Sequence, residues 1–412
     1  MKNKLFISLI IILTFHLTNA QKKIFDKDGE LTKIVDKNNK ELGYWTFIKG
    51  YVTLADHVYV VGNKKDPNKN GNWEAYYKNG KLQEKGEYQN NKKIGFWKKY
   101  HDDGVMGESG TYKNDLRQGE WLFNYKHGYA HADTLQTKAN YIDGELNGHF
   151  EQYYLNGKLE MKGDYDKGNK TGKWSFYYEN GQLNEEMSFA NQELHGMYKS
   201  FRENGTPFKS GEYKNGKQIG KWTDYDDKNK LRSATIYDSI SKKITWYHDN
   251  GKTKRIANYK NNGKTKKDCP YSSLEDCIYE KNGEWLEYYE NGEIQLKEHY
   301  IDDEKNGAFL FYNQSGNVTK EGWYEDGKEE KIWQTYFDNG KLESKTNYIS
   351  SFRQGKSQTF YESGILKSEG NYNRGYEDGE WLYYDEKGKI KNKITYSMGK
   401  DVNGPIPTGA PR

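Results

Sequence analysis

One spacing of glycine, aromatic and polar residues recurs along most of this chain. Gly71-Asn72-Trp73 is followed 24 residues later by Gly95-Phe96-Trp97, and 24 residues after that by Gly119-Glu120-Trp121. In the first copy, aromatic and polar residues alternate from 73 to 78 and again from 82 to 88, with Asn79-Gly80 between the two stretches. Alternation on both sides of Asn-Gly is typical of a β-hairpin. The fixed step therefore predicts one hairpin unit that is copied many times.

The turn of the first hairpin predicts its register. A two-residue type I′ turn at Asn79-Gly80, with positive φ at both residues, pairs Trp73 with Gly86 and Gly71 with Tyr88. Each glycine then lies opposite a large ring, and the ring can cover backbone that a glycine leaves exposed. We interpret these rings as the thin core of a sheet. Asn229 replaces the turn glycine in one copy, and asparagine also tolerates a positive φ.

A second ring follows three residues after the tryptophan position in most copies. By strict alternation it faces the other side of the sheet, unless a bulge re-aims it. Rings interleaved with Lys and Glu on an open face could stack against sugar rings or grip an extended polypeptide. The candidate binding face therefore consists of Tyr76, Tyr100, Tyr153, Tyr177, Tyr288, Tyr312 and Tyr336.

The repeats predict an all-β protein. We expect an elongated antiparallel sheet of about 13 consecutive 24-residue hairpins plus a partial first unit. Residues 21–70 are expected to form that partial repeat and an extra strand or cap. The expected repeat blocks are 71–259 and 283–396, separated by an insertion at 260–282, and a disordered tail is expected at 397–412.

The N-terminus is typical of a signal peptide. Lys2 and Lys4 precede an apolar stretch from 5 to 17, and small residues follow before a cut after Ala20. Residues 1–20 therefore predict an exported protein that is periplasmic, on the cell surface or secreted, with no transmembrane segment after cleavage. Export also favours a disulfide between Cys269 and Cys277, the two cysteines of the chain, with two free thiols as the alternative.

Charge and local motifs exclude several function classes. The 64 basic and 60 acidic residues nearly cancel, so no general attraction to nucleic acid is expected. The Gly-Lys-Thr sequences at 251–253 and 263–265 lack the earlier glycine of a phosphate loop and fit hairpin turns. His127 and His131 have the spacing of a zinc pair, but they lie in a segment without helical periodicity and are interpreted as loop residues. We expect no catalytic residue, no cofactor and no metal site.

The complete unit, G-x-W-x-x-Y-Y-x-N-G-x-L-x-x-x-G-x-Y-x-x-G-K-x-x-G, resembles the bacterial variant of the MORN repeat (membrane occupation and recognition nexus). Residues 172–183 and 285–292 match it closely, and the resemblance covers nearly all of residues 43–396. It implies an elongated sheet of consecutive hairpins, with roles in scaffolding, protein–protein contact and, less directly, lipid contact. It implies no catalytic residues.

Our leading functional hypothesis is a non-enzymatic exported scaffold that binds a protein partner of unknown identity, or itself, along the sheet surface. The alternative is a cell-surface module that binds a glycan or a lipid. Some bacterial relatives carry an antitoxin-type label, which fits an exported chain poorly because a cytosolic toxin would not meet it.

Overall fold

The computed structural model describes residues 22–36, 38–48, 56–61, 68–126, 134–264, 268 and 277–404, with side chains outside 43–61. The chain divides into two compact units, Met1–Glu193 and Leu194–Arg412. Residues 1–20, and with them the expected signal peptide, lie outside the described residues.

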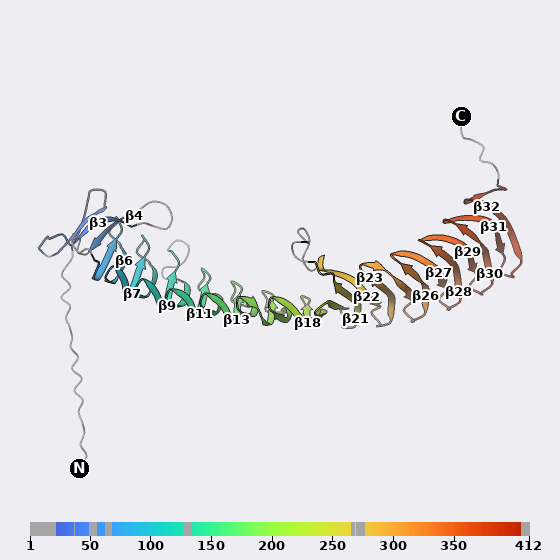
Figure 1. The fold of residues 1–412 in the computed structure, drawn as a ribbon, viewed down its shortest axis with the longest axis horizontal. Coiled ribbons are helices and arrows are strands. Elements are labelled where there is room, and N and C mark those ends of the chain that lie inside the picture. The colour runs from blue at the N-terminus through green and yellow to red at the C-terminus, as the bar shows by residue number, and fades with distance from the viewer. Residues whose placement is uncertain are drawn as a thin grey trace, which may run out of the picture. The chain divides into compact units, whose positions relative to one another are not determined.

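Unit 1 contains a small two-stranded sheet, β1 with β2, and a larger antiparallel sheet. In the larger sheet each strand from β3 to β14 pairs with the next one along the chain (Figure 1). The strands are β1 (Lys22–Phe25), β2 (Leu31–Val35), β3 (Gly43–Ile48), β4 (Asp56–Val61), β5 (Gly71–Tyr76), β6 (Leu82–Gln89), β7 (Lys92–Tyr100), β8 (Met106–Lys113), β9 (Leu116–Asn124), β10 (Leu135–Ile142), β11 (Glu145–Tyr153), β12 (Leu159–Asp166), β13 (Asn169–Tyr177) and β14 (Leu183–Ala190).

Unit 2 is built in the same way. Each strand from β16 to β23 pairs with the next, as does each strand from β25 to β33, and β23 pairs with both β24 and β25. The strands are β16 (Gly196–Phe201), β17 (Pro207–Lys214), β18 (Lys217–Tyr225), β19 (Leu231–Tyr237), β20 (Ser241–Tyr247), β21 (Thr253–Asn261), β22 (Tyr279–Tyr288), β23 (Ile294–Ile301), β24 (Glu304–Lys305), β25 (Gly307–Tyr312), β26 (Val318–Glu325), β27 (Lys328–Tyr336), β28 (Leu342–Ile349), β29 (Phe352–Phe360), β30 (Leu366–Asn373), β31 (Tyr376–Tyr384), β32 (Ile390–Ser397) and β33 (Lys400–Asp401). The two-residue β15 (Glu193–Leu194) lies at the boundary between the units.

These pairings confirm the predicted all-β fold of consecutive antiparallel hairpins. They also extend it, because β32 pairs with β33 through Ser397 and Lys400, inside the range expected to be a disordered tail. Residues 405–412 lie outside the described residues.

The Asn-Gly turn differs from the prediction. The N–H of Gly80 donates to the Tyr77 carbonyl at 2.9 Å and the N–H of Tyr77 donates to the Lys81 carbonyl at 2.9 Å. Of the two residues, Gly80 alone has a positive φ, 74°. This is a three-residue loop with a left-handed glycine at its end, so the two-residue type I′ turn predicted there is wrong. Asn229, with φ 61°, occupies the glycine position as expected.

Type I′ turns occur instead where one hairpin passes into the next. Gln89 pairs with Lys92, and the two residues between them, Asn90 and Asn91, have φ values of 50° and 65°. Positive φ at both central residues defines this turn. The segment expected to be a polar connection is therefore itself a tight hairpin, so the sheet has tight turns along both of its edges.

The predicted register is nevertheless confirmed: Trp73 pairs with Gly86 and Gly71 pairs with Tyr88. A bulge explains this result. Tyr76 pairs with Leu82 and Ala75 pairs with Glu84, so Gln83 is left without a partner in the ladder. The extra turn residue shifts the pairing by one position, and the bulge shifts it back.

The ring that covers each strand glycine comes from the following copy, which the register did not reveal. A Cβ added at Gly86 would lie 2.2 Å from Cδ2 of Trp97, and one added at Gly110 would lie 2.2 Å from Cδ2 of Trp121. Gly71 has a different role, because it has a φ of 79° and an added Cβ would meet nothing within 4 Å. The first glycine of Gly-x-Trp is thus required by backbone conformation and the later one by a ring.

Candidate functional site: the two faces of the sheet

The two faces of each sheet carry different side chains. We call the face that carries Trp73, Tyr88, Trp97 and their equivalents the Trp face. The opposite face, which carries Tyr100, Tyr153 and their equivalents, is the Tyr face. The repeat therefore places rings on both faces, and this answers the question that strict alternation left open.

The Trp face is closed by its own side chains. Trp97 is 3% exposed, and it makes edge-to-face contacts with Tyr88 at 5.0 Å and Tyr112 at 6.2 Å between ring centroids. Its indole N–H donates to the carbonyl of Glu87 at 3.2 Å, beside the glycine that the ring covers. Such contacts add about 0.5–1.5 kcal/mol per pair beyond burial. The tryptophans of this face are therefore structural, as predicted.

Cations complete the Trp face. The Lys93 ammonium lies 4.0 Å from the centroid of Trp97, and the Lys170 ammonium lies 4.2 Å from that of Trp174. Burial lowers the pKa of Lys170, because a desolvated ammonium favours its neutral form. These ammonium groups pack over the rings as part of the sheet.

The candidate binding residues lie as one tyrosine per hairpin on the Tyr face. Tyr100, Tyr153 and Tyr177 are half-buried in unit 1, and Tyr288, Tyr312 and Tyr336 are half-buried in unit 2. Tyr76 differs from them. It is 6% exposed and packs with Leu31 and Ile34 of β2, so the small N-terminal sheet covers it and it does not belong to the open part of the face.

Glutamates hold several of these tyrosines. The Tyr153 hydroxyl donates to Oε2 of Glu151 at 2.6 Å, and the Tyr336 hydroxyl donates to Oε1 of Glu321 at 2.5 Å. Burial and then the hydrogen bond to Glu151 raise the pKa of Tyr153 to about 12. The rings are therefore neutral donors with fixed orientations, which suits recognition of a surface more than acid–base chemistry.

Cross-strand ion pairs and single apolar side chains surround the tyrosines. The Lys138 ammonium lies 2.9 Å from a Glu120 carboxylate oxygen, and that of Lys297 lies 2.7 Å from Glu284. Phe96 in unit 1 and Met197 in unit 2 are exposed on this face, at 58% and 56%. The Tyr face thus combines half-buried tyrosines, paired charges and separate apolar side chains.

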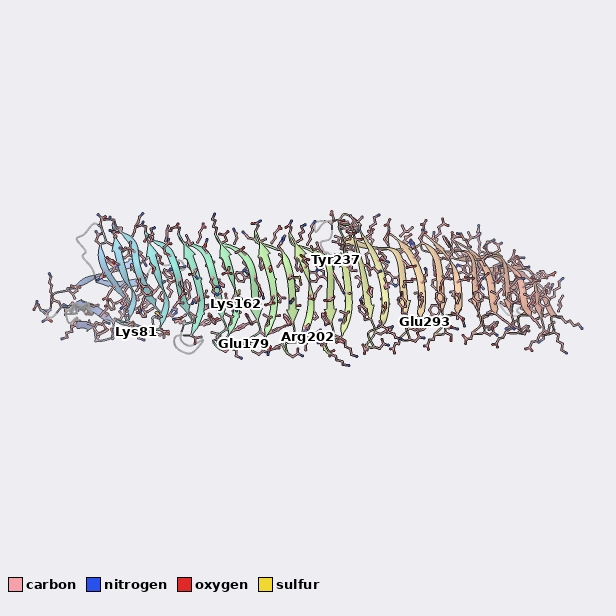
Figure 2. The ribbon with its side chains drawn as sticks, turned by 90° about the horizontal axis from the view of Figure 1, so that it is seen from below. Lys81, Lys162, Glu179, Arg202, Tyr237 and Glu293 are labelled. Atoms are coloured by element: carbon pink, nitrogen blue, oxygen red, sulfur yellow. The ribbon has the colours of Figure 1, made fainter. Side chains whose placement is uncertain are left out.

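The Asn-Gly turns carry a ladder of contacts that sequence reasoning missed. Asn79 Nδ2 donates to the carbonyl of Asp102 at 2.7 Å, and Lys81 Nζ donates to that of Asp103 at 2.6 Å. Asn156 and Lys158 repeat both contacts at a later pair of turns, with the carbonyls of Glu179 and Asn180. Figure 2 labels this edge of the sheet at Lys81 and Glu179 in unit 1 and at Arg202 and Glu293 in unit 2. The recurring Asn-Gly-Lys sequence was the signal that could have predicted the ladder.

Other predicted features are only partly described. Cys277 is disulfide-bonded, but Cys269 lies outside the described residues, so their pairing stays a prediction. His127 and His131 also lie outside them. Within the described part of the chain, no three acidic, histidine or cysteine residues are grouped as a metal site would need. Gly251 is a turn glycine, since its N–H donates to the carbonyl of His248 at 2.8 Å. No helix in the described ranges is long and apolar enough to span a bilayer.

The fold and its two faces define a β-hairpin repeat protein. The model of the MORN repeat variant family matches nine segments of the chain, at residues 69–90, 146–167, 170–191, 194–215, 242–261, 281–302, 329–350, 353–374 and 377–398. The chain belongs to this family of MORN-repeat proteins.

Solved structures with some similarity include toxin-complex components. Two of them, the crystal structures of TcdB2-TccC3-TEV and TcdB2-TccC3, are 12% identical over 92% of this chain, with TM-scores of 0.15 and 0.14. The Photorhabdus luminescens Tc holotoxin pore is 12% identical over 90% of this chain, with a TM-score of 0.14. This chain covers 26%, 27% and 24% of those three chains, respectively. No curated protein matches the chain.

Proposed function

We propose that this chain is a non-enzymatic, exported scaffold that binds a protein partner on its Tyr face. The observation that carries the proposal is the row of half-buried tyrosines on this face, in which Glu151 and Glu321 hold the hydroxyls of Tyr153 and Tyr336. Tyrosines in a polar surround are typical of protein–protein interfaces. Membership of a repeat family supports the same conclusion, because stacked repeats present extended binding surfaces.

Fixed side chains strengthen the argument. Half-buried rings that are already hydrogen-bonded lose little conformational entropy on binding. The ion pairs beside them, such as Lys138 with Glu120, can exchange partners with charges on an incoming surface. Each hairpin offers a similar set, so a long partner could contact several hairpins in succession.

The absence of catalysis and the export are parts of the same proposal. Catalysis usually takes place on irregular loops in a cleft, whereas the Tyr face is made of one repeated set of side chains. Export rests on residues 1–20. Expression of the full chain in its native host should give an envelope or secreted product whose N-terminus is Gln21, and an unprocessed cytosolic product would contradict export.

Charge reversal on the Tyr face tests the binding surface. The double variant Phe96→Glu/Met197→Glu places a carboxylate on this face in each unit. The matched control Leu116→Glu/Ile301→Glu changes two residues of similar exposure, 45% and 44%, beside the type I′ turns. The mature chain, residues 21–412, would be immobilised and incubated with envelope extract.

Loss of a central apolar contact costs about 2 kcal/mol or more, which is roughly a thirtyfold loss of affinity. We expect the Phe96 and Met197 variant to lose the captured partner and the control to retain it. Leu116 and Ile301 lie at the type I′ edge of the same face, so equal losses in both variants would contradict a binding surface centred on Phe96 and Met197. A wild-type chain that captures nothing, and that stays monomeric in light scattering, would contradict the scaffold.

A further inference from the structure

A pocket of about 350 Å³ lies in unit 2 where the repeat step is two residues short. It is on the Trp face, near the turns that join β18 to β19 and β20 to β21. Trp246, Arg232, Lys254 and Arg255 line it, together with the turn carboxylates Asp226 and Asp249. Its volume is at the lower end of the range of small-molecule sites, which run from about 300 to 1,000 Å³.

A displaced tryptophan explains why the pocket is present here. In β18 and β22, Trp222 pairs with Thr235 and Trp285 pairs with Ala257. In β20, between them, Ile244 occupies this column, because it pairs with both Thr235 and Ala257. The indole of this copy, Trp246, is two residues nearer the turn. It pairs with Ser233 on one side and Arg255 on the other, and the small Ser233 leaves its ring half-buried at the edge of the pocket.

The cations around Trp246 have unused hydrogen-bonding capacity. Arg232 and Lys254 are exposed bulge residues, and no hydrogen bond or ion pair holds either side chain among the residues that the structure describes. The Arg255 guanidinium donates through one Nη to Glu287 at 2.7 Å. Its Nε is buried without a hydrogen-bond partner in that part of the chain. The Arg255 guanidinium is therefore a fixed part of the pocket wall, and Arg232 and Lys254 are the cations that a ligand can reach.

The side chains that line the pocket favour an anionic ligand. Four cations, Arg232, Lys254, Arg255 and Lys230, line the pocket against the two carboxylates of Asp226 and Asp249. Asp226 is already engaged, since its Oδ1 accepts the backbone N–H groups of Lys228 and Lys230 at 3.0 and 2.7 Å. Lys230 Nζ donates to the carbonyl of Asp249 at 2.7 Å. Lys230 and Arg255 are therefore held by protein groups, and Arg232 and Lys254 are the cations available to a ligand.

We infer that this pocket binds an anionic sugar ring, a hexuronate residue of an acidic glycan. The apolar face of the pyranose stacks on Trp246. Its carboxylate accepts hydrogen bonds from Arg232 and Lys254. The side chain of Asp249 accepts from a sugar hydroxyl. This site lies on the opposite face from the proposed partner surface and does not depend on it.

Isothermal titration of the mature chain with oligogalacturonate in low-salt buffer tests the inference, with an uncharged galactose oligomer of equal length as the neutral ligand. We expect the acidic oligomer to bind and the neutral one to bind at least about tenfold more weakly, because it offers no carboxylate. Monomeric galacturonate should bind at the same site. Raised salt should weaken binding of both acidic ligands.

Matched variants locate the site. Arg232→Ala/Lys254→Ala should weaken oligogalacturonate binding about tenfold or more. Lys367→Ala/Lys391→Ala removes two cations from the same bulge position of two later hairpins in unit 2, away from Trp246, and should change affinity less than about twofold. Trp246→Phe, which keeps a ring and so keeps the sheet folded, should bind more weakly than wild type. The inference is overturned if the folded wild type does not bind the acidic oligomer, if the neutral oligomer binds equally well, or if both alanine pairs lose affinity equally. Variants on the Tyr face should leave this titration unchanged, so the two proposals fail separately.

Discussion

The contact between a strand glycine and the tryptophan of the next copy predicts how stability depends on both residues. In Gly163→Ala, the new Cβ would lie 2.3 Å from Cδ2 and 2.4 Å from Cε2 of Trp174, a ring that is fully buried. The ring must move, and overpacking of this kind costs about 1–3 kcal/mol. Movement also weakens the hydrogen bond from the indole to the Asp164 carbonyl, 3.2 Å long, by about 1 kcal/mol. We expect a total loss of about 2–4 kcal/mol.

A second substitution should recover part of this loss. This chain already contains the pair Ala139 and Phe150 at the equivalent positions of an earlier hairpin. The double variant Gly163→Ala/Trp174→Phe recreates that pair. Trp174→Phe alone should cost about 1–3 kcal/mol for the void and the lost indole N–H. The double variant should be more stable than the sum of the two single changes predicts, by about 1–3 kcal/mol.

Gly172→Ala is the control for backbone strain. Gly172 has a φ of 62°, and an added Cβ would meet nothing within 4 Å, so only the left-handed conformation is penalised, by about 1–2 kcal/mol. Urea unfolding of the mature chain followed by circular dichroism gives the order of stabilities. Because a repeat array can unfold in parts, hydrogen exchange of residues 159–177 would locate the effect. Equal losses for Gly163→Ala and Gly172→Ala, or strict additivity in the double variant, would refute the reasoning.

Three further predictions concern the turns, acid stability and the cysteines. Asn156→Ala removes a bond to the Glu179 carbonyl and one from the Lys158 N–H, so it should cost about 1–2 kcal/mol and speed exchange at 177–182; unchanged exchange there would contradict the turn ladder. A hydrogen bond from Lys356 lowers the pKa of Glu369, so its contribution is present above the ordinary glutamate pKa, about 4.3, and is lost as pH falls through the lower folded value. Glu369→Gln should therefore reduce the urea midpoint at neutral pH and flatten its fall in acid, and parallel acid limbs for the two proteins would contradict this. If Cys269 pairs with Cys277, the unfolded, unreduced mature chain should react with no thiol reagent until a reductant is added.

The fold could be predicted well from the sequence, because two regularities of the sequence are also present in the structure. One is the alternation of side chains along each strand, and the other is the 24-residue repeat of the hairpins. The sequence predicted the pairing of Trp73 with Gly86 by two errors that cancelled, a turn one residue too short and an unseen bulge at Gln83. The type I′ turn was predicted at the Asn-Gly edge of the sheet but occurs at the opposite edge. This error arose because Asn-Gly is compatible with more than one type of loop. The connecting turn Asn90-Asn91 contains no glycine, so little in the sequence indicated a type I′ turn there.

The candidate site was predicted only in part. Alternation placed Tyr100 and Tyr153 on the face away from the tryptophans, but it could not show that β2 covers Tyr76, since that contact joins elements far apart in the chain. The ring over each glycine could have been found by comparing copies. Gly86, Gly110 and Gly163 each lie eleven residues before a tryptophan, whereas Ala139 lies eleven residues before Phe150. Ala257 is the exception, because it is an alanine at the glycine position and the next copy still has a tryptophan, Trp285.

The glycine and the ring that covers it belong to different copies, and this has a consequence for where an array of such hairpins can stop. A chain cut after Gly163 but before Trp174 would leave a bare strand backbone exposed to water at its end, whereas a cut after Ala139 or Thr346 would not. The last described hairpin has Ile394 where the glycine would stand, opposite Trp381. An isoleucine side chain there shields the backbone without help from a following copy. Met187 and Thr346 occupy the same position in internal hairpins, opposite Trp174 and Trp333, and the copies that follow them carry Tyr198 and Ser357 in place of tryptophan. A copy added after β32 would therefore need a smaller residue than tryptophan at that position, and Ile394 could stay.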